Sequence, residues 1–390
     1  MKHRTALVVG LLCVSLALQR AGVAGQRLTA EFEEVQHFPG GSIQTSNTNT
    51  FPESSTISGS LVNLTAGGLR EPHWHTPSEW AFVLSGTCRV TLVVAGSDHP
   101  AESWDFIQGD AWAFPSNAGH TILGLQDGCV YVAAYNSGSF DEISDSLGLS
   151  AWLTTVPAAR LAQALNTSVA NTALPNQGSS PILQGDLEAL TAGQINAPLL
   201  ATEASAFGQA DQLQITANSH RFPVTYGVKP TITATGAGYI RQVDSTYFTS
   251  GVNFSGGIVR QDPGSLRQLH WHLEADEWQF GINGTLEVYA VTNQGQVLNG
   301  TLREGQAGFI PRGAGHYLYN PTSEPAYFAV VFNNAKFSTT SLPGFIGNLP
   351  LEYLAATLDV PANTLKSWNI AKAQELAAPQ STPSAVNTAG

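Results

Sequence analysis

One pattern of three histidines and a glutamate occurs twice in this chain, in the same order and with nearly the same spacing. The two sets are His73, His75, Glu79 and His120, and His270, His272, Glu277 and His316. The surrounding sequence also repeats, because residues 41–74 align with residues 238–271 at a constant offset of 197. Such self-similarity indicates two copies of one structural unit. A chain of 390 residues has room for two domains that each bury a core.

Each copy reads as β-structure followed by short helices. Four segments are rich in β-branched and aromatic residues and are separated by glycine-containing turns, namely residues 80–84, 89–94, 130–135 and 287–291. Charged residues make up only 12% of the chain, which argues against long surface helices. After the strands, Pro157 and Pro361 stand where a second short helix would begin. We therefore expect an all-β fold of two tandem domains, each with short C-terminal helices.

The spacing of the repeated pattern predicts a metal site in each copy. Residues two apart on a strand project to the same face, so both histidines of an H-x-H pair point into one interior. The glutamate follows four or five residues later on the continuing strand, and the third histidine 44 or 45 residues later on a neighbouring strand. Three neutral imidazoles and one carboxylate suit Mn²⁺ or Fe²⁺, with Zn²⁺ and Cu²⁺ as alternatives. A single H-x-H is more often incidental, but the complete set occurs twice.

The start of the chain predicts export. Lys2, His3 and Arg4 precede an apolar run over residues 6–18, and small residues follow up to Gly25. This run is too short for a membrane anchor, so we expect a secreted protein without a membrane-spanning segment. The expected organisation is a signal peptide (1–25), a first domain (26–170), a linker and packing arm (171–215), a second domain (216–372) and a disordered tail (373–390).

The net charge limits the kinds of partner that the protein can bind, and the cysteines limit its possible disulfides. Removal of the signal peptide leaves 14 basic against 29 acidic side chains, a net charge of 14 − 29 = −15. This balance excludes a nucleic-acid partner, which requires a basic footprint. Cys88 and Cys129 are the only cysteines after the signal peptide, and they either form a disulfide or pack as small core residues. Five N-x-S/T sequons predict a glycoprotein, at Asn63, Asn166, Asn253, Asn283 and Asn299.

The repeated residues resemble the two signature motifs of the cupin superfamily. These motifs are G-x5-H-x-H-x(3,4)-E-x6-G and G-x5-P-x-G-x2-H-x3-N, and the second copy fits both throughout. The first copy departs from the second motif only, with Asn117 in place of its inner glycine and Gly124 in place of its asparagine. Those positions shape turns and supply no ligands. The resemblance implies that each domain is a cupin barrel, a double-stranded β-helix of the jelly-roll type.

Within the cupins, the chain resembles the bicupin oxalate decarboxylases over roughly residues 38–370. The similar strings are LREPHWH (69–75), LRQLHWH (266–272), ADEWQF (275–280), GDAWAFPS (109–116) and GSFDEISD (138–145). The resemblance implies two Mn²⁺ ions per chain, oxalate as the substrate, formate and carbon dioxide as products, and dioxygen as a participant in catalysis. Assembly into a homo-oligomer, as a trimer or a hexamer, stays open.

Three residues outside the ligand sets take their expected roles from this resemblance. Arg70 and Arg267 each precede the H-x-H pair by three residues, where a guanidinium could hold a metal-bound carboxylate of oxalate. Glu142 corresponds to the glutamate of a mobile lid over the first site, which implies the role of general acid. Asp141 and Asp145 are lesser candidates for that role.

Some members of this family place a glutamate near the second metal, on the strand after the last histidine ligand. Here the aligned position is Val330 or a neighbour in an apolar run, so the second site lacks an evident acid. We therefore expect chemistry mainly at the first site, and a structural or electron-transfer role for the second. Three other functions stay open. They are oxalate oxidation, which yields hydrogen peroxide and carbon dioxide, a non-catalytic storage or wall cupin, and a cupin dioxygenase acting on a bulkier substrate.

Overall fold

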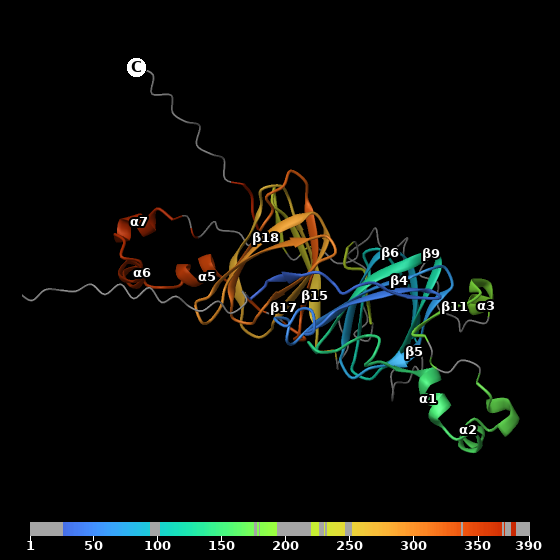
Figure 1. Cartoon of the computed structure of the whole chain (residues 1–390). Coiled ribbons are helices and arrows are strands. Elements are labelled where there is room, and N and C mark those ends of the chain that lie inside the picture. Colours follow the sequence, from blue (N-terminus) through green and yellow to red (C-terminus); the bar gives the residue numbers. More distant parts are fainter. Residues whose placement is uncertain are drawn as a thin grey trace, which may run out of the picture.

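The computed structural model describes residues 26–93, 102–174, 178, 180–192, 220–225, 230, 232–245, 252–336, 338–368, 370 and 376–379. The predicted signal peptide, most of the predicted linker and most of the predicted tail lie outside these residues. The described part consists of two β-barrels side by side, with short helices at the two far ends (Figure 1). The all-β fold of two tandem barrels with short helices is confirmed.

The first barrel is built from an 11-stranded sheet that curls back on itself. Its strands are β2 (Gln36–Phe38), β3 (Gly41–Ser46), β4 (Ser58–Leu64), β5 (Gly68–Trp74), β6 (Glu79–Val93), β7 (Glu102–Ile107), β8 (Ala111–Phe114), β9 (Gly119–Tyr135), β10 (Leu147–Gly148), β11 (Ile182–Gln184) and β12 (Arg221–Phe222). The two longest, β6 and β9, pair antiparallel along almost their whole length. Buried apolar side chains such as Ile43, Val83, Phe106 and Ile122 fill the interior, because alternate residues of each strand face inward.

The second barrel has the same plan, with its strands divided between two sheets of seven and six strands. The first sheet holds β1 (Thr29–Ala30), β13 (Ile232–Ala234), β14 (Gly238–Val243), β15 (Ser255–Gln261), β17 (Glu277–Asn283), β20 (Ala307–Ile310) and β22 (Ala326–Phe332). The second holds β16 (Leu266–His272), β18 (Thr285–Val291), β19 (Val297–Arg303), β21 (Gly315–Tyr319), β23 (Thr339–Ser341) and β24 (Leu376–Ala377). Leu286, Val288, Leu318 and Phe328 are part of the core between them.

The two barrels exchange strands. The N-terminal strand β1 pairs with β20 of the second barrel, whereas β12, which precedes the second repeat, pairs with β8 of the first. A strand that lies next to the first barrel in sequence thus completes a sheet of the second barrel, and a strand that lies next to the second barrel completes the sheet of the first. A compositional reading of the sequence does not predict this exchange.

The barrels also share a hydrophobic core that is built reciprocally around two tryptophans. Trp80 and Trp278 are each 1% exposed and belong to one buried cluster that draws on both barrels. A Cβ atom added to Gly59 would lie 2.4 Å from the ring of Trp278, and one added to Gly256 would lie 2.9 Å from Trp80. The glycines are therefore required for the indoles to approach the opposing strands, and neither barrel buries this apolar surface alone.

The helices form two arms at opposite ends of the molecule (Figure 1). The described helices are α1 (Leu149–Thr155), α2 (Ala158–Ala164), the 3₁₀ helix η1 (Val169–Thr172), α3 (Leu187–Ala192), α5 (Leu342–Gly347), α6 (Leu351–Leu358) and α7 (Ala362–Lys366). Pro157 and Pro361 precede α2 and α7 as predicted, where the missing backbone N–H costs no hydrogen bond. None of the described helices has both the length and the hydropathy needed to cross a bilayer.

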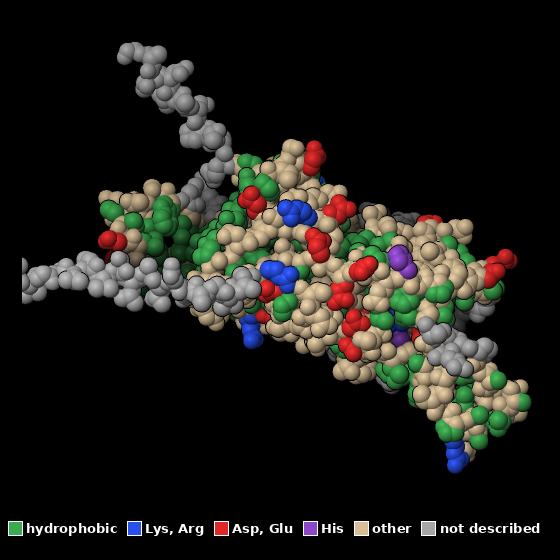
Figure 2. All heavy atoms as spheres, in the orientation of Figure 1, with side chains coloured by type: hydrophobic (Ala, Val, Ile, Leu, Met, Phe, Trp, Pro, Cys, Tyr) green, Lys and Arg blue, Asp and Glu red, His purple; other side chains and the backbone are tan. Residues whose placement is uncertain are grey.

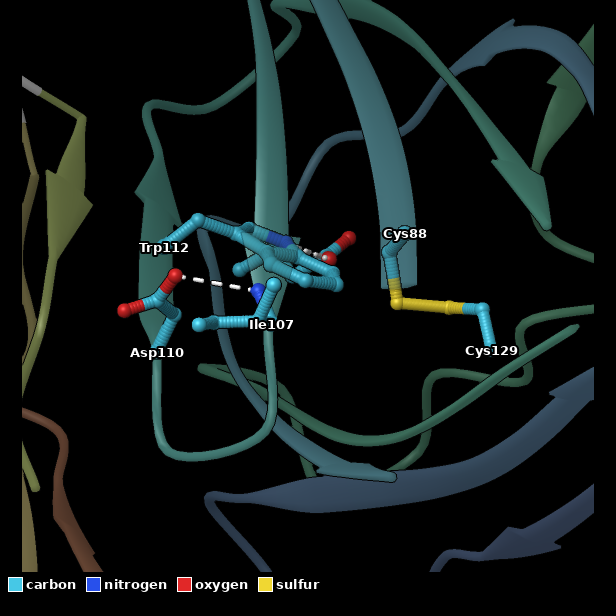
Figure 3. Close-up of a disulfide and its surroundings, with 6 residues drawn as sticks. Cys88, Ile107, Asp110, Trp112 and Cys129 are labelled. Atoms are coloured by element: carbon cyan, nitrogen blue, oxygen red, sulfur yellow. Dashed lines mark hydrogen bonds between the residues drawn. A yellow bond between two sulfur atoms is a disulfide. The ribbon is translucent and has the colours of Figure 1, made fainter. Parts of the chain in front are cut away.

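Cys88 of β6 and Cys129 of β9 form a disulfide within the first barrel (Figure 3). Their Cα atoms are 5.1 Å apart, and both residues are buried in the core beside Trp112 and Phe106. Of the two alternatives that the sequence left open, the structure shows the bonded one. The bond links residues that are 41 positions apart, so it ties the two longest strands of this barrel together.

One part of the predicted disordered tail is ordered. Leu376 and Ala377 form β24, which pairs antiparallel with β16 beside Leu266 and Arg267. Leu376 is fully buried and joins the core of the second barrel. The prediction of disorder is therefore wrong for this strand, because Leu376 is buried in the core and docks the strand on the edge of β16.

Candidate metal centres

The four predicted ligands of the second barrel converge on one point. His270 and His272 come from β16, Glu277 is the first residue of β17, and His316 lies on β21. One ligand atom from each residue lies within 4.8 Å of the others, and all four side chains are buried. The cluster is therefore formed by the paired strands β16 and β21 of one sheet together with β17 of the other sheet.

The first barrel repeats this arrangement. His73, His75 and His120 bring their ligand nitrogens within 4.8 Å of one another. Glu79 joins them, because its Oε2 lies 3.2 Å from His75 Nε2 and 3.5 Å from His120 Nε2. The structure thus contains two buried clusters of three histidines and one glutamate, one in each barrel.

Hydrogen bonds fix the tautomer of the histidines in both clusters. Each Nδ1 lies 2.6–3.0 Å from a backbone carbonyl oxygen, in turn that of Glu71, Pro77, Ala118, Gln268, Ser338 and Ala314. A carbonyl oxygen only accepts, so Nδ1 carries the proton and Nε2 of the neutral ring presents a lone pair to the interior. The Nε2 atoms of His73 and His120 are buried and have no hydrogen-bond partner among the described residues. Such lone pairs fit a divalent cation, and the backbone contacts orient them for it.

The surroundings also set the protonation of the candidate ligands. Burial, reinforced by the positive charge of Arg70, lowers the pKa of His73 to about 3. Burial alone would raise the pKa of Glu79, but the adjacent side chains of His120 and His75 lower it to about 2. The pKa values of His270 and Glu277 also lie well below their usual ranges, for corresponding reasons. Neutral imidazole and ionised carboxylate are the forms that bind a metal.

His75 differs from the other ligands. Burial would lower its pKa, but the hydrogen bond and the negative charge of Glu79 outweigh burial and raise it. A metal binds only the deprotonated imidazole, so the raised pKa of His75 makes cation binding at the first cluster weaken as the pH falls.

The outer oxygen of each glutamate is held by a different donor in the two barrels. In the first, Trp112 Nε1 donates to Glu79 Oε1 over 2.7 Å. In the second, Gln279 Nε2 donates to Glu277 Oε1 over 2.7 Å. These contacts orient the carboxylates so that the opposite oxygen, Oε2, faces the histidines. Neither donor was identified from the sequence, although Trp112 lies within the string GDAWAFPS.

The two donors lie on different strands of equivalent strand pairs. In the first barrel the donor is on β8, whereas in the second it is on β17, which is equivalent to β6. Trp112 pairs with Ala81 in the β6–β8 ladder, and Gly308 pairs with Gln279 in the β17–β20 ladder. A Cβ atom at Gly308 would lie 2.7 Å from Gln279 Oε1, so the glutamine needs a glycine opposite it. In each barrel, a large side chain that donates a hydrogen bond to the glutamate is paired with a small residue, Ala81 or Gly308. The barrels differ only in which of the two paired strands carries the donor.

Replacing Trp112 with phenylalanine is expected to weaken metal binding at the first cluster about 10- to 100-fold, because the ring is kept but the N–H donor to Glu79 is lost. The mirrored variant Gln279→Met should weaken the second cluster alone. Titration of the metal-free proteins with Mn²⁺ against a competing chelator measures both dissociation constants. An unchanged first-site constant in Trp112→Phe would exclude the orienting role of the indole.

Glu142 lies inside the first cluster, against Arg70. Arg70 Nε donates to Glu142 Oε1 over 2.9 Å, and Arg70 Nη2 donates to the backbone oxygen of Glu142 over 3.1 Å. The same Oε1 is 3.5 Å from His73 Nε2, and both Arg70 and Glu142 are at most 2% exposed. Burial would raise the pKa of Glu142, but the charge of Arg70 and the adjacent side chain of His73 hold it well below its usual range. Glu142 is therefore ionised here and takes the position beside Arg70 that an anion would occupy.

The loop that carries Glu142 is longer than its counterpart in the second barrel. Eleven residues separate Tyr135 from Leu147, whereas seven separate Phe332 from Thr340, the equivalent positions in the strand pairings. The shorter loop, residues 333–339, contains neither aspartate nor glutamate. It therefore offers no counterpart of Glu142 to the second cluster.

The second cluster is enclosed by apolar side chains. Arg267 and three of the four candidate ligands, His270, His272 and Glu277, line a cavity of about 20 Å³ together with Val330, Phe328 and Phe332. This volume accommodates about one water molecule. The first barrel has Tyr131 and Tyr135 where the second has the two phenylalanines. The second cluster therefore has room for an ion, but no room for a dicarboxylate unless core side chains move.

A larger cavity of about 730 Å³ lies between the barrels. Its walls include Phe82, Leu84, Phe280 and Ile282. Among the described residues, the only sets of side chains arranged to hold a metal are the two buried clusters, and neither lines this cavity. We therefore place the candidate chemistry in the clusters.

Comparisons with known proteins extend over both barrels. The cupin family model matches residues 33–173 and 227–366. Oxalate decarboxylase OxdC of Bacillus subtilis (strain 168) is 29% identical over 314 residues, which cover 79% of this chain and 75% of that protein. An oxalate decarboxylase of Arthroderma benhamiae is 25% identical over 351 residues, covering 84% and 78%. The structure of oxalate decarboxylase from Bacillus subtilis at pH 4.6 superposes with a TM-score of 0.78 at 23% identity, over 91% of this chain and 88% of that one.

Proposed function

Because this chain belongs to the cupin family, as a bicupin related to the oxalate decarboxylases, we propose that it is a manganese-dependent oxalate decarboxylase. In the proposed reaction, hydrogen oxalate loses carbon dioxide, the carbon–carbon bond breaks, and the remaining carbon takes up a proton to give formate. The observation that carries the proposal is the position of Glu142, which contacts both Arg70 and His73 inside the first cluster. A buried acid is thereby placed beside both a candidate metal ligand and a cation suited to a carboxylate.

The residues of the first cluster suggest how substrate enters. Arg70 donates twice to Glu142 and once to the backbone oxygen of Pro181, so oxalate can reach the guanidinium only by displacing Glu142. Displacement removes the charge that keeps Glu142 ionised, and the freed carboxyl group can then carry a proton. Glu142 delivers this proton to the carbon from which carbon dioxide has left. Phe140 packs on His75 and Tyr135 and helps to exclude water from that carbon.

The metal would be held by His73, His75, Glu79 and His120. With dioxygen as a participant, bound manganese would supply Lewis acidity and reversible one-electron chemistry, in which the electron taken from oxalate is returned before formate leaves. We propose that His270, His272, Glu277 and His316 hold a second ion. Its site supports electron transfer or structure, since most of its remaining wall is apolar and no acid other than Glu277 lines it among the described residues. Arg267 lines that second site as Arg70 does the first.

One assay distinguishes the proposed reaction from its rivals. Purified protein is analysed for bound metal, given oxalate at mildly acidic pH under air, and assayed for formate and hydrogen peroxide together. Decarboxylation gives one formate per oxalate consumed and little peroxide. Stoichiometric peroxide with two carbon dioxide molecules and no formate would instead make the protein an oxalate oxidase. No consumption of oxalate by the metal-loaded protein would favour a storage or wall cupin, or a dioxygenase for a bulkier substrate.

We also propose that the protein is secreted, glycosylated and oligomeric. The five sequon asparagines are exposed, and Asn283 ends β17 directly before Gly284, whose φ of +84° turns the chain into β18. Both helical arms carry exposed apolar side chains, among them Trp152, Leu165, Phe345 and Tyr353 (Figure 2). Such patches favour association of copies through the arms. Mass spectrometry of the exported protein tests the cleavage site and the glycans, and light scattering tests for a trimer or hexamer.

A further inference from the structure

The loop that carries Glu142 is anchored at its far end by a carboxylate that the proposed chemistry does not use. Glu71 is 5% exposed and follows Arg70 on β5. Its Oε2 accepts a hydrogen bond from Ser150 Oγ over 2.6 Å, and Ser150 N lies 3.4 Å from the same oxygen. Ser150 belongs to the first turn of α1, so Glu71 holds the start of this helix against the strand that forms the site.

The backbone at this anchor is closely packed. A Cβ atom on Gly148 would lie 2.1 Å from Glu71 Oε1, so the carboxylate rests directly on the chain that leads into α1. Gly148 pairs with His73, and Leu147 pairs with Trp74, through the short strand β10. The end of the loop is therefore tied to the same strand that presents Arg70 and two candidate metal ligands.

The near end of the loop has its own anchor. The backbone oxygen of Gly138 accepts from Thr48 N over 2.8 Å, and Phe140 is 5% exposed and packs against His75 and Tyr135. Only residues 141–146 lie between the two anchors. The segment that can move with Glu142 is thus short, and the anchors at its two ends limit the positions that it can adopt.

The segment between the anchors is held together internally. Asp141 Oδ1 accepts from the backbone N–H groups of Ile143 and Ser144, over 3.0 and 2.8 Å. Asp141 N donates to Asp145 Oδ2, and Asp145 N donates to Asp141 O, each over 2.9 Å. These four bonds do not depend on Arg70. The segment can therefore leave and return as a unit, provided that its ends stay in place.

In the described part of the second barrel no carboxylate anchors the equivalent helix. Gln268 stands at the position of Glu71, and the corresponding helix α5 is capped locally by Ser341, whose Oγ accepts from Gly344 N over 3.1 Å. Gly148, the equivalent residue before α1, offers no side chain to cap the helix. A carboxylate from the neighbouring strand replaces the local cap only in the barrel whose loop carries an acid.

We infer that Glu71 is a positioning residue, which fixes the carboxyl-terminal hinge of residues 141–146 so that Glu142 returns to Arg70 in the same place after each opening. This inference rests on the proposed function, because the return matters when Glu142 must meet the substrate carbon before the reaction takes another course. Loss of the hinge should leave the metal and Arg70 in place but make proton delivery less reliable. Formate should then fall relative to peroxide.

The test compares Glu71→Ala, Ser150→Ala and Glu71→Gln with Gln268→Ala as the matched control in the second barrel. Hydrogen exchange followed by mass spectrometry should show amides 141–150 exchanging about tenfold faster in the first two variants, because a hydrogen bond to a charged group is lost. Strands of the barrels should exchange as before. Glu71→Gln keeps an acceptor and should restore most of the protection, and Gln268→Ala should change nothing in this loop. Ser150→Ala leaves β5 untouched, so it decides the matter if Glu71→Ala folds poorly.

The product ratio supplies the second readout. In Glu71→Ala and Ser150→Ala the ratio of formate to peroxide should drop about tenfold, with bound metal unchanged and the KM for oxalate shifted far less. Unchanged exchange of the loop would overturn the inference, and so would faster exchange with an unaltered product ratio. If the wild-type protein does not consume oxalate, the proposed function fails together with this catalytic role. The exchange data would still decide whether Glu71 anchors the loop.

Discussion

Replacing Glu142 with alanine should lower the rate of formate production at least about 100-fold, because general acids typically contribute that much or more to a proton-transfer step. Arg70 and the four candidate ligands remain in this variant, so oxalate and metal should still bind. The intermediate left after loss of carbon dioxide then lacks its proton donor. It should instead be oxidised to a second carbon dioxide, with formation of peroxide. Formate and peroxide measured in the same reaction, with metal content determined in parallel, check this expectation.

Glu142→Gln separates the proton from the packing. The glutamine side chain keeps the shape and can still accept from Arg70 Nε, as Glu142 Oε1 does over 2.9 Å, but it carries no acidic proton. It should lose formate production as completely as the alanine variant. Glu188→Gln, an exposed acid on α3, serves as the matched control and should behave as wild type. Formate production by Glu142→Gln at the wild-type rate would remove the assigned role.

Removing one ligand from each cluster should affect activity unequally. His120→Ala and His316→Ala are matched, since both residues are buried and turn Nε2 into their own cluster. Each variant should lose one of two metal ions per chain. His120→Ala should lose activity more than about 100-fold, because a metal stabilises charge in the transition state by several kcal/mol. His316→Ala should keep a substantial part of it, since the described residues place no acid other than the candidate ligand Glu277 at its cluster and the cavity there is small.

Metal analysis together with steady-state rates checks this pair. Mn²⁺ titration must show that each variant retains the ion of the unaltered barrel, and thermal unfolding must show that the fold persists. Activity lost equally in both variants, with the first-site ion still bound to His316→Ala, would contradict the expected division between the sites. The second cluster would then take part in the chemistry itself.

The ligand sets could be predicted because their information is local. The alternation of side chains along a strand places His73 and His75 on one face, and their repetition as His270 and His272 excludes coincidence. Asn117 also follows from local chemistry. It adopts φ of +60° where the second barrel has Gly313 at +79°, and asparagine tolerates this left-handed conformation better than other side chains. The departure from the motif therefore leaves the turn intact.

Contacts between distant segments could not be predicted in the same way. The backbone oxygen of Pro181, in the segment expected to be a linker, accepts from Arg70 because β11 pairs with β5. Trp112 reaches Glu79 from another strand, and Gln279 performs the same task in the second barrel. No spacing in the sequence encodes these partners. They depend on which strands lie side by side and on the small residue that stands opposite each donor.

The sequence by itself determined the duplicated barrel, the eight candidate ligands and the two arginines, since periodicity and repetition are properties of the chain before it folds. The tertiary structure alone decided that Cys88 and Cys129 bond, that the barrels exchange strands, and that Glu142 rests on Arg70 rather than in solvent. The physical reason is range. Side-chain direction along a strand is set by its own backbone, whereas the partner of a buried group is set by the packing of segments that can lie 100 or more residues apart, as Arg70 and Pro181 do.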